Sequence, residues 1–159
     1  MSDDKPLSGK KAVVTGASRG IGRSIALKFA EAGAELALLA RSESGLSKVA
    51  DECKAFGVGC HVVLADLTDA KATESASEEI VSALGKVNIL VNNAGADLSY
   101  GVSVADSDPQ VWWRSIEVNI LGVYHITRFL LEHIPDGGKI INMSSGMGLT
   151  PAPNQSSYV

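Results

Sequence analysis

The sequence predicts an α/β fold, a doubly wound parallel sheet, from three observations. Short apolar runs alternate with segments of helical spacing along almost the whole chain of 159 residues. The apolar runs are unbroken, which is typical of strands that are buried on both faces of a parallel sheet. The first run ends in a cluster of glycines, as at a tight turn from a strand into a helix. Right-handed crossovers then give about five strands in the order 3-2-1-4-5.

Composition indicates the size and the setting of this fold. The length corresponds to a single domain over residues 1–159, and contents of 45% hydrophobic and 20% charged residues are globular values. A net charge of −4 argues against a nucleic-acid partner. No apolar run approaches the roughly 20 residues of a membrane span, and the polar N-terminus shows no signal peptide. The two cysteines, Cys53 and Cys60, suggest a reducing compartment, so we expect a cytoplasmic protein.

The first half of the chain is expected to contain three strands and two helices. The strands are expected at Lys11–Thr15, Glu35–Ala40 and Cys60–Ala65. The first helix is expected at Gly20–Ala32, and apolar side chains four residues apart share one of its faces: Ile21, Ile25 and Phe29. The second helix is marked by Leu46, Val49, Cys53 and Phe56. Gly33 and Gly57 follow these helices and are suited to ending them.

The second half predicts two more helices and two more strands. Thr68 can cap a helix that runs to Leu84, and Asp108 can cap a long helix with Pro109 in its first turn. An apolar stripe at spacings of four and three marks one face of the long helix: Ile116, Ile120, Val123, Thr127, Leu130 and Ile134. The strands are expected at Val87–Val91 and Lys139–Met143, and a loop at Ser144–Val159.

The glycine cluster after the first strand carries the clearest functional signal. Gly16 can turn the chain off the strand, Gly20 can let a pyrophosphate approach the backbone, and Gly22 can let the helix pack close to the sheet. Free N–H groups at the start of the helix would bind the phosphate. The spacing Gly-x3-Gly-x-Gly differs from the commoner Gly-x-Gly-x-x-Gly, and an ordinary glycine-rich turn is the alternative.

Polar residues also follow the other strands at the edge where such sheets bind ligands. They are Arg41, Asp66, Asn92–Gly95, Ser144 and Ser145. The long helix places Asn119 on the same side as Ile116 and Val123, and Tyr158 follows Ser145 by thirteen residues.

Together these residues resemble the classical short-chain dehydrogenase/reductase (SDR) family, over the chain from about Leu7 to Val159. The matching motifs are Thr15–Gly22, Asp66, Asn92–Gly95, Asn119, Ser145 and Tyr158, in order and at family-like spacing. The resemblance implies a Rossmann-type NAD(P)-binding domain and hydride transfer between a nicotinamide and a small carbonyl or alcohol substrate. It also implies that the full-length form is a homo-oligomer.

The family motif Tyr-x-x-x-Lys would place a lysine at position 162, and the family's sheet continues through further strands. We therefore expect a C-terminally truncated member, whose Rossmann domain lacks the C-terminal strands and which is inactive by itself. A non-catalytic NADP-binding module and a non-functional truncated product with an exposed fifth strand are the alternatives.

The resemblance also implies roles for single residues. Tyr158 would be the general acid, Ser145 would donate a hydrogen bond to the substrate oxygen, and Asn119 would order a water in a proton relay. Asp66 would meet the adenine amino group, with Leu67 beside the ring. The cofactor-binding set is Gly16, Ser18, Arg19, Gly20, Ile21, Gly22, Arg41, Asp66, Leu67, Asn93, Ala94, Gly95, Arg128 and Tyr158.

The preferred cofactor follows from the residues at the end of the second strand. Arg41 stands there with no carboxylate, and Arg19 lies in the glycine loop, so NADP(H) is favoured over NAD(H) because a cation suits a 2′-phosphate. Solvated surface charges are the alternative for both arginines and for Arg128, a capping role for Asp66, and a structural turn for Asn92–Gly95. The histidines lack neighbours at metal-ligand spacing, so no metal site is expected.

Overall fold

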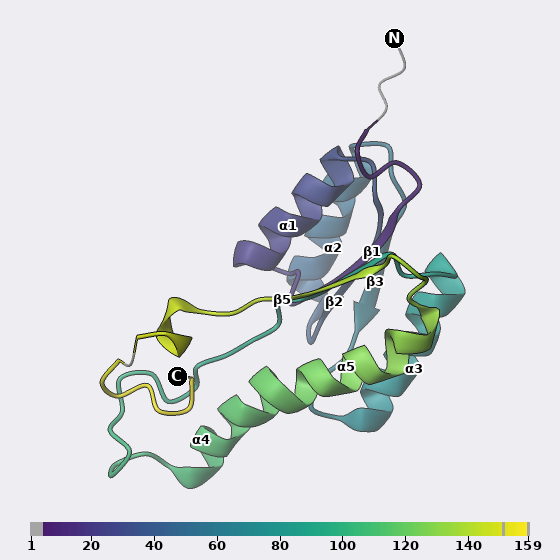
Figure 1. The fold of residues 1–159 in the computed structure, drawn as a ribbon. Coiled ribbons are helices and arrows are strands. Elements are labelled where there is room, and N and C mark those ends of the chain that lie inside the picture. Colours follow the sequence, from purple (N-terminus) through teal and green to yellow (C-terminus); the bar gives the residue numbers. More distant parts are fainter. Residues whose placement is uncertain (1–4, 151, 159) are drawn as a thin grey trace.

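The computed structural model describes residues 5–150 and 152–158, and a parallel sheet runs through its middle (Figure 1). Its strands are β1 (Lys11–Thr15), β2 (Glu35–Ala40), β3 (Cys60–Leu64), β4 (Ile89–Asn92) and β5 (Lys139–Asn142). Their order is β3-β2-β1-β4-β5, and every neighbouring pair is parallel. The predicted fold class and strand order are therefore confirmed.

Helices cover both faces of this sheet (Figure 1). The helices α1 (Gly20–Glu31) and α2 (Glu43–Lys54) pack on one face around Val14 and Leu36. The helices α3 (Ala70–Leu84) and α5 (Gly122–Leu130) pack on the other face around Val13 and Leu39. Alternate residues of one strand thus enter two separate cores, which explains why the strands are apolar without interruption.

Small side chains bring α1 close to the sheet. Gly22, Ala26 and Ala30 are its buried residues, whereas Ile21 is 63% exposed. Of the predicted apolar face, Ile25 and Phe29 are partly buried and pack against the core beside these small residues.

Two helix boundaries differ from the sequence prediction. The α3 helix is capped by Asp69, whose carboxylate accepts a hydrogen bond from Ala72 N at 3.0 Å, and not by Thr68. Thr68 lies one residue before this cap and donates its N–H and its hydroxyl proton to Asp66 Oδ1. The prediction for α2 was also too long, since Phe56 lies beyond the helix and is 41% exposed.

The predicted long helix is interrupted by a π-helical turn. The helix α4 (Pro109–Ile116) begins at the predicted cap Asp108, and the turn η1 (Glu117–Leu121) joins it to α5. The predicted apolar stripe is wrong at Ile120, because a π turn holds an extra residue and rotates the face of the helix, whereas Leu130 is buried as predicted and Ile134 packs against the core. Ile120 is 62% exposed, and the buried residues are Ser115, Gly122, Ile126 and Leu130.

The segments after α5 place β5 and the last loop. A 3-10 turn, η2 (Leu131–His133), ends the long helix, and β5 forms the edge of the sheet, where Ile141 is 41% exposed. The expected loop Ser144–Val159 contains one short 3-10 turn, η3 (Gly146–Gly148), and its residues 151 and 159 lie outside the described part. None of the helices in residues 5–150 and 152–158 is long and apolar enough to cross a membrane.

Candidate functional site

A cleft of about 780 Å³ opens at the carboxyl edge of the sheet, where the chain order reverses between β1 and β4. Most residues of the predicted cofactor set line it: Gly16, Ser18, Arg19, Gly20, Ile21, Arg41, Asp66, Leu67, Asn93, Ala94 and Gly95. The structure therefore brings together residues from four separate segments of the sequence. Gly22, Arg128, Asn119, Ser145 and Tyr158 lie outside the lining of the cleft.

The glycine loop forms one wall of the cleft through three different backbone requirements. Gly16 has φ of +65°, and a Cβ there would lie 2.9 Å from Ala94 Cα. Gly22 lies beneath the loop, where a Cβ would overlap Gly16 O and Asn93 Nδ2. Gly20 has φ of +58°, with no atom within 4 Å of an added Cβ, so its backbone faces open space at the cleft.

The start of α1 is open to an anion. Arg19 occupies the N-cap position, and its side chain makes no capping hydrogen bond to the helix. The first N–H groups of α1 are therefore left without a side-chain cap beside the bare backbone of Gly20. This arrangement fits the pyrophosphate of a dinucleotide, since the helix dipole and the N–H groups both favour negative charge.

A single hydroxyl joins this wall to the loop after β4. Thr15 Oγ1 donates to Val91 O at 3.2 Å and accepts from the N–H groups of Asn93 and Ala94, each at 3.0 Å. Asn93 Nδ2 donates in turn to Thr15 O at 3.0 Å and to Gly16 O at 3.3 Å. Asn93 thus holds the two strand ends together, and it also lines the cleft.

At the far end of the cleft, the Asp66 carboxylate is hydrogen-bonded on both oxygens. Oδ1 accepts from Thr68 N at 3.0 Å and Thr68 Oγ1 at 2.8 Å, and Oδ2 accepts from Arg114 Nη2 at 2.7 Å. Desolvation by burial raises the pKa of Asp66, but the Thr68 bonds and the charges of Arg114 and Arg41 outweigh it. The net pKa lies below the ordinary value, so Asp66 is a carboxylate at neutral pH.

Two arginines and two serines also belong to the lining of the cleft. Arg19 and Arg41 line the cleft, as do Ser42 and Ser44 at the start of α2. The sequence did not lead us to predict these serines, although their place close after Arg41, at the end of a strand, was a signal that could have indicated them. Further residues that were not predicted are Leu39, Ala40, Gly45, Ala65, Thr68 and Val118. Most of these are small or apolar residues that carry no chemical signal in a sequence.

The three predicted catalytic residues lie on segments that leave the same edge of the sheet. Ser145 caps η3, and its Oγ accepts from Met147 N at 3.2 Å, a bond that does not use the hydroxyl proton. Asn119 lies in η1 and is hydrogen-bonded to the loop after β4. Its Oδ1 accepts from Ala96 N at 2.9 Å, and its Nδ2 donates to Ala96 O at 2.8 Å.

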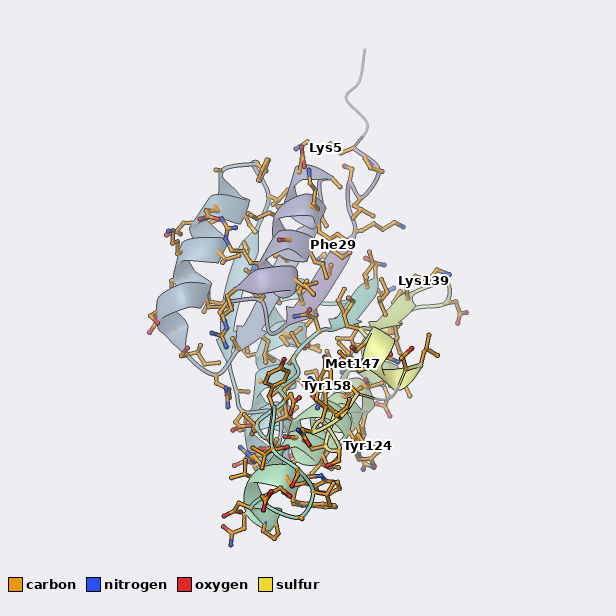
Figure 2. All side chains as sticks on the ribbon, turned by 90° about the vertical axis from the view of Figure 1, so that its left-hand side faces the viewer. Lys5, Phe29, Tyr124, Lys139, Met147 and Tyr158 are labelled. Carbon is orange, nitrogen blue, oxygen red and sulfur yellow. The ribbon has the colours of Figure 1, made fainter. Side chains whose placement is uncertain are left out.

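Tyr158 lies on a loop that is tied to the rest of the molecule by three hydrogen bonds. Ser157 Oγ and Ser99 Oγ, both on buried residues, are 2.6 Å apart, and Ser156 Oγ accepts from Trp112 Nε1 at 2.9 Å. Asn154 O accepts from Gly101 N at 3.0 Å. Figure 1 shows this C-terminal loop beside the loop that precedes α4, and Figure 2 shows Tyr158 and Met147 in the same part of the molecule.

Arg128 is not brought to the cleft. Its Nη1 donates to Tyr124 Oη at 3.2 Å on the exposed side of α5. Within residues 5–150 and 152–158, no group of three or more His, Cys, Asp or Glu side chains is arranged to hold a metal ion.

Comparison with known proteins extends these observations. Residues 10–159 match the family model described as short chain dehydrogenase. The chain is 41% identical over 160 residues to the short chain dehydrogenase tazN of Aspergillus terreus. It is 38% identical over 153 residues to the 3-oxoacyl-[acyl-carrier-protein] reductase FabG of Staphylococcus aureus. Among solved structures, the carveol dehydrogenase of Mycobacterium avium in complex with NAD is 30% identical, with a TM-score of 0.88.

These matches cover nearly all of this chain but only part of each relative. The alignment spans 96% of the chain and 35% of tazN, and 94% of the chain and 61% of FabG. The structural match spans 97% of the chain and 61% of the carveol dehydrogenase.

Proposed function

Because this chain belongs to the short-chain dehydrogenase family, we propose that its cleft binds NADP(H) and serves hydride transfer between the nicotinamide and a small carbonyl or alcohol substrate. This proposal rests mainly on one observation: the same cleft is lined by the glycine loop, where the start of α1 has no side-chain cap, and by Arg19 and Arg41. The glycine loop suits the pyrophosphate of a dinucleotide, and the arginines suit the 2′-phosphate that NADP(H) carries.

The end of β2 supports NADP(H) over NAD(H). The strand ends in Ala40, followed by Arg41 and Ser42, so no carboxylate stands where it would accept from a ribose 2′-hydroxyl. A guanidinium can bind phosphate with two parallel hydrogen bonds, and the hydroxyls of Ser42 and Ser44 can donate to the remaining oxygens.

Replacement of Arg41 tests this assignment. Arg41→Asp is expected to weaken NADPH binding by at least about tenfold, the value of one charge-assisted hydrogen bond, and to leave NADH binding the same or stronger. Both affinities can be measured from the fluorescence of the reduced nicotinamide. Lys48→Asp is the matched control, because it makes the same charge change at an exposed residue of α2 that does not line the cleft. An unchanged ratio of the two affinities in Arg41→Asp would refute the preference for NADP(H).

The loop after β5 supports the proposed chemistry. A bound nicotinamide supplies or accepts the hydride. We assign to Tyr158 the transfer of the proton at the substrate oxygen, and to Ser145 a hydrogen bond that positions that oxygen. The bond from Met147 N to Ser145 Oγ does not use the hydroxyl proton, which is consistent with this role. Asn119 would order a water for the proton relay while its amide anchors Ala96.

The activity of these 159 residues alone is expected to be very low. A tyrosine phenol ordinarily titrates near pH 10, roughly three units above neutral pH, and the family motif supplies a lysine ammonium at position 162 to favour the phenolate. NADPH oxidation with a panel of carbonyl substrates checks this expectation. Turnover at ordinary enzyme rates by the 159 residues would refute it. Nucleotide binding without turnover in the full-length protein would favour the alternative, a non-catalytic NADP-binding module.

We further propose that the full-length protein acts in the cytoplasm as a homo-oligomer that pairs through the long helix. Apolar side chains on α4, η1 and α5 support a contact surface there, since Trp113, Ile120 and Tyr124 are each more than half exposed. Light scattering on the full-length protein and on Ile120→Glu tests this proposal, because a buried glutamate in the interface would shift the protein toward monomer.

A further inference from the structure

Arg114 lies outside the cleft and yet contacts one of the residues that line it. Its Nη2 donates to Asp66 Oδ2 at 2.7 Å, although 48 positions separate the two residues in the sequence. Its Nη1 donates to Glu117 Oε2 at 3.1 Å on the same side of the long helix. The guanidinium is thus held between two carboxylates, one of which belongs to the proposed adenine site.

The helix that carries Arg114 is fixed at its start. Asp108 Oδ1 accepts from Gln110 N at 2.7 Å and from Val111 N at 3.2 Å, and Pro109 occupies the first turn. Arg114 therefore reaches Asp66 from a defined backbone position.

The hydrogen bonds on Asp66 leave a specific acceptor site. A carboxylate offers about four lone-pair sites, two on each oxygen. On Oδ1, Thr68 N and Thr68 Oγ1 fill both sites. On Oδ2, Arg114 fills one, so a single acceptor site is left on a side chain that lines the cleft. Because Arg114 holds Oδ2, rotation of the carboxylate cannot exchange this site for another.

We propose that Arg114 is a positioning residue for base selection: it fixes Asp66 so that the one acceptor site on Oδ2 receives the amino group of adenine. This inference rests on the proposed function, since it assumes that a dinucleotide occupies the cleft. A fixed acceptor favours a base with an amino group at this point and disfavours one with a carbonyl oxygen. Without Arg114, Oδ2 has two open lone-pair sites in place of one and can accept from a ring N–H as well as from an amino group, so discrimination between the bases falls.

The test compares NADPH with its hypoxanthine analogue, in which a carbonyl oxygen replaces the adenine amino group. We expect the full chain to bind NADPH about tenfold more tightly than the analogue, the value of one hydrogen bond to a charged acceptor. In Arg114→Gln the preference is expected to fall to about threefold or less. In Arg114→Lys it is expected to recover in part, because an ammonium can still donate to Oδ2.

Arg23→Gln is the matched control, since Arg23 Nη2 also pairs with a carboxylate, Glu52 Oε2, at 2.6 Å but does not line the cleft. It should keep the parent preference. Both glutamine variants should melt within a few degrees of the parent, because half-exposed ion pairs contribute about 0–1 kcal/mol to stability.

The outcomes separate this inference from the proposed function. If Arg114→Gln keeps the parent preference, or if the parent does not distinguish the two nucleotides, the inference is overturned while NADP(H) binding stands. If the folded parent binds neither nucleotide, the proposed function fails and the inference fails with it.

Discussion

Replacement of Gly20 by alanine tests two roles of this glycine, its positive φ and the space that it leaves at the cleft. Gly20 has a positive φ, +58°, which disfavours any residue with a Cβ, and it faces open space at the cleft. Gly57 has φ of +81° and also has no atom within 4 Å of an added Cβ, but it does not line the cleft. The two glycines are therefore matched in strain and differ in position.

The strain sets the expected loss of stability. The left-handed conformation costs an L-residue about 1–2 kcal/mol, and the lower entropy of the unfolded alanine chain offsets about 0.4–1 kcal/mol of this. Each variant should therefore lose about 1 kcal/mol in the free energy of unfolding, which lowers Tm by roughly 2–4 °C in a chain of this length.

The affinity for NADPH is the measurement that distinguishes Gly20→Ala from Gly57→Ala. In Gly20→Ala the new methyl group occupies space that a pyrophosphate needs in order to reach the N–H groups of α1. Loss of one or two charge-assisted hydrogen bonds weakens NADPH binding by about 10- to 100-fold. Gly57→Ala should bind like the parent. Titration calorimetry and thermal melting on the three proteins provide both numbers. Equal NADPH affinity in Gly20→Ala and Gly57→Ala would refute the phosphate site at this loop.

Three further predictions concern packing, pH and the catalytic loop. Gly22→Ala should cost about 1–3 kcal/mol in urea unfolding, because an added Cβ overlaps backbone below the glycine loop; wild-type stability would contradict the close approach. Because the folded pKa of Asp66 is lowered, its contribution to stability is complete above the unfolded pKa of about 3.9 and is lost as pH falls through the folded pKa. Asp66→Asn should therefore flatten the loss of stability below about pH 4, and an unchanged slope would count against the shift. Ser157→Ala leaves the buried Ser99 hydroxyl without its partner and should cost about 1–3 kcal/mol while hastening proteolysis of the last loop; equal cleavage rates would argue against the tether.

The sheet could be predicted from the sequence because its signal is local. Each strand is a short apolar run with both faces buried, so its position followed from composition, to within two residues at each end. The strand order then followed from the handedness of crossovers, which depends on chirality and not on side chains. The glycine loop was predictable for a similar reason, since glycine is the residue that best tolerates the positive φ and close approach to Ala94 at Gly16 and the contact of Gly22 with backbone.

The helices were harder to predict because tertiary contacts decide their details. The π turn at η1 rotates the long helix, so Ile120 faces outward although its spacing matches the stripe. Thr68 and Asp69 are both suitable caps by residue type, and only the structure shows that Asp69 is the cap while the Thr68 hydroxyl donates to Asp66. The link between Arg114 and Asp66 joins elements 48 positions apart, and no local pattern indicates it.

The Thr15 hydroxyl has a consequence for how a ligand would enter. The hydroxyl donates its proton to Val91 O and accepts from the N–H groups of Asn93 and Ala94, so all of its hydrogen-bonding positions are used. The carboxyl ends of β1 and β4 are therefore held firmly together. If a dinucleotide binds across this contact between β1 and β4, the two strand ends are already held in place, so little entropy is lost in ordering them around the ligand.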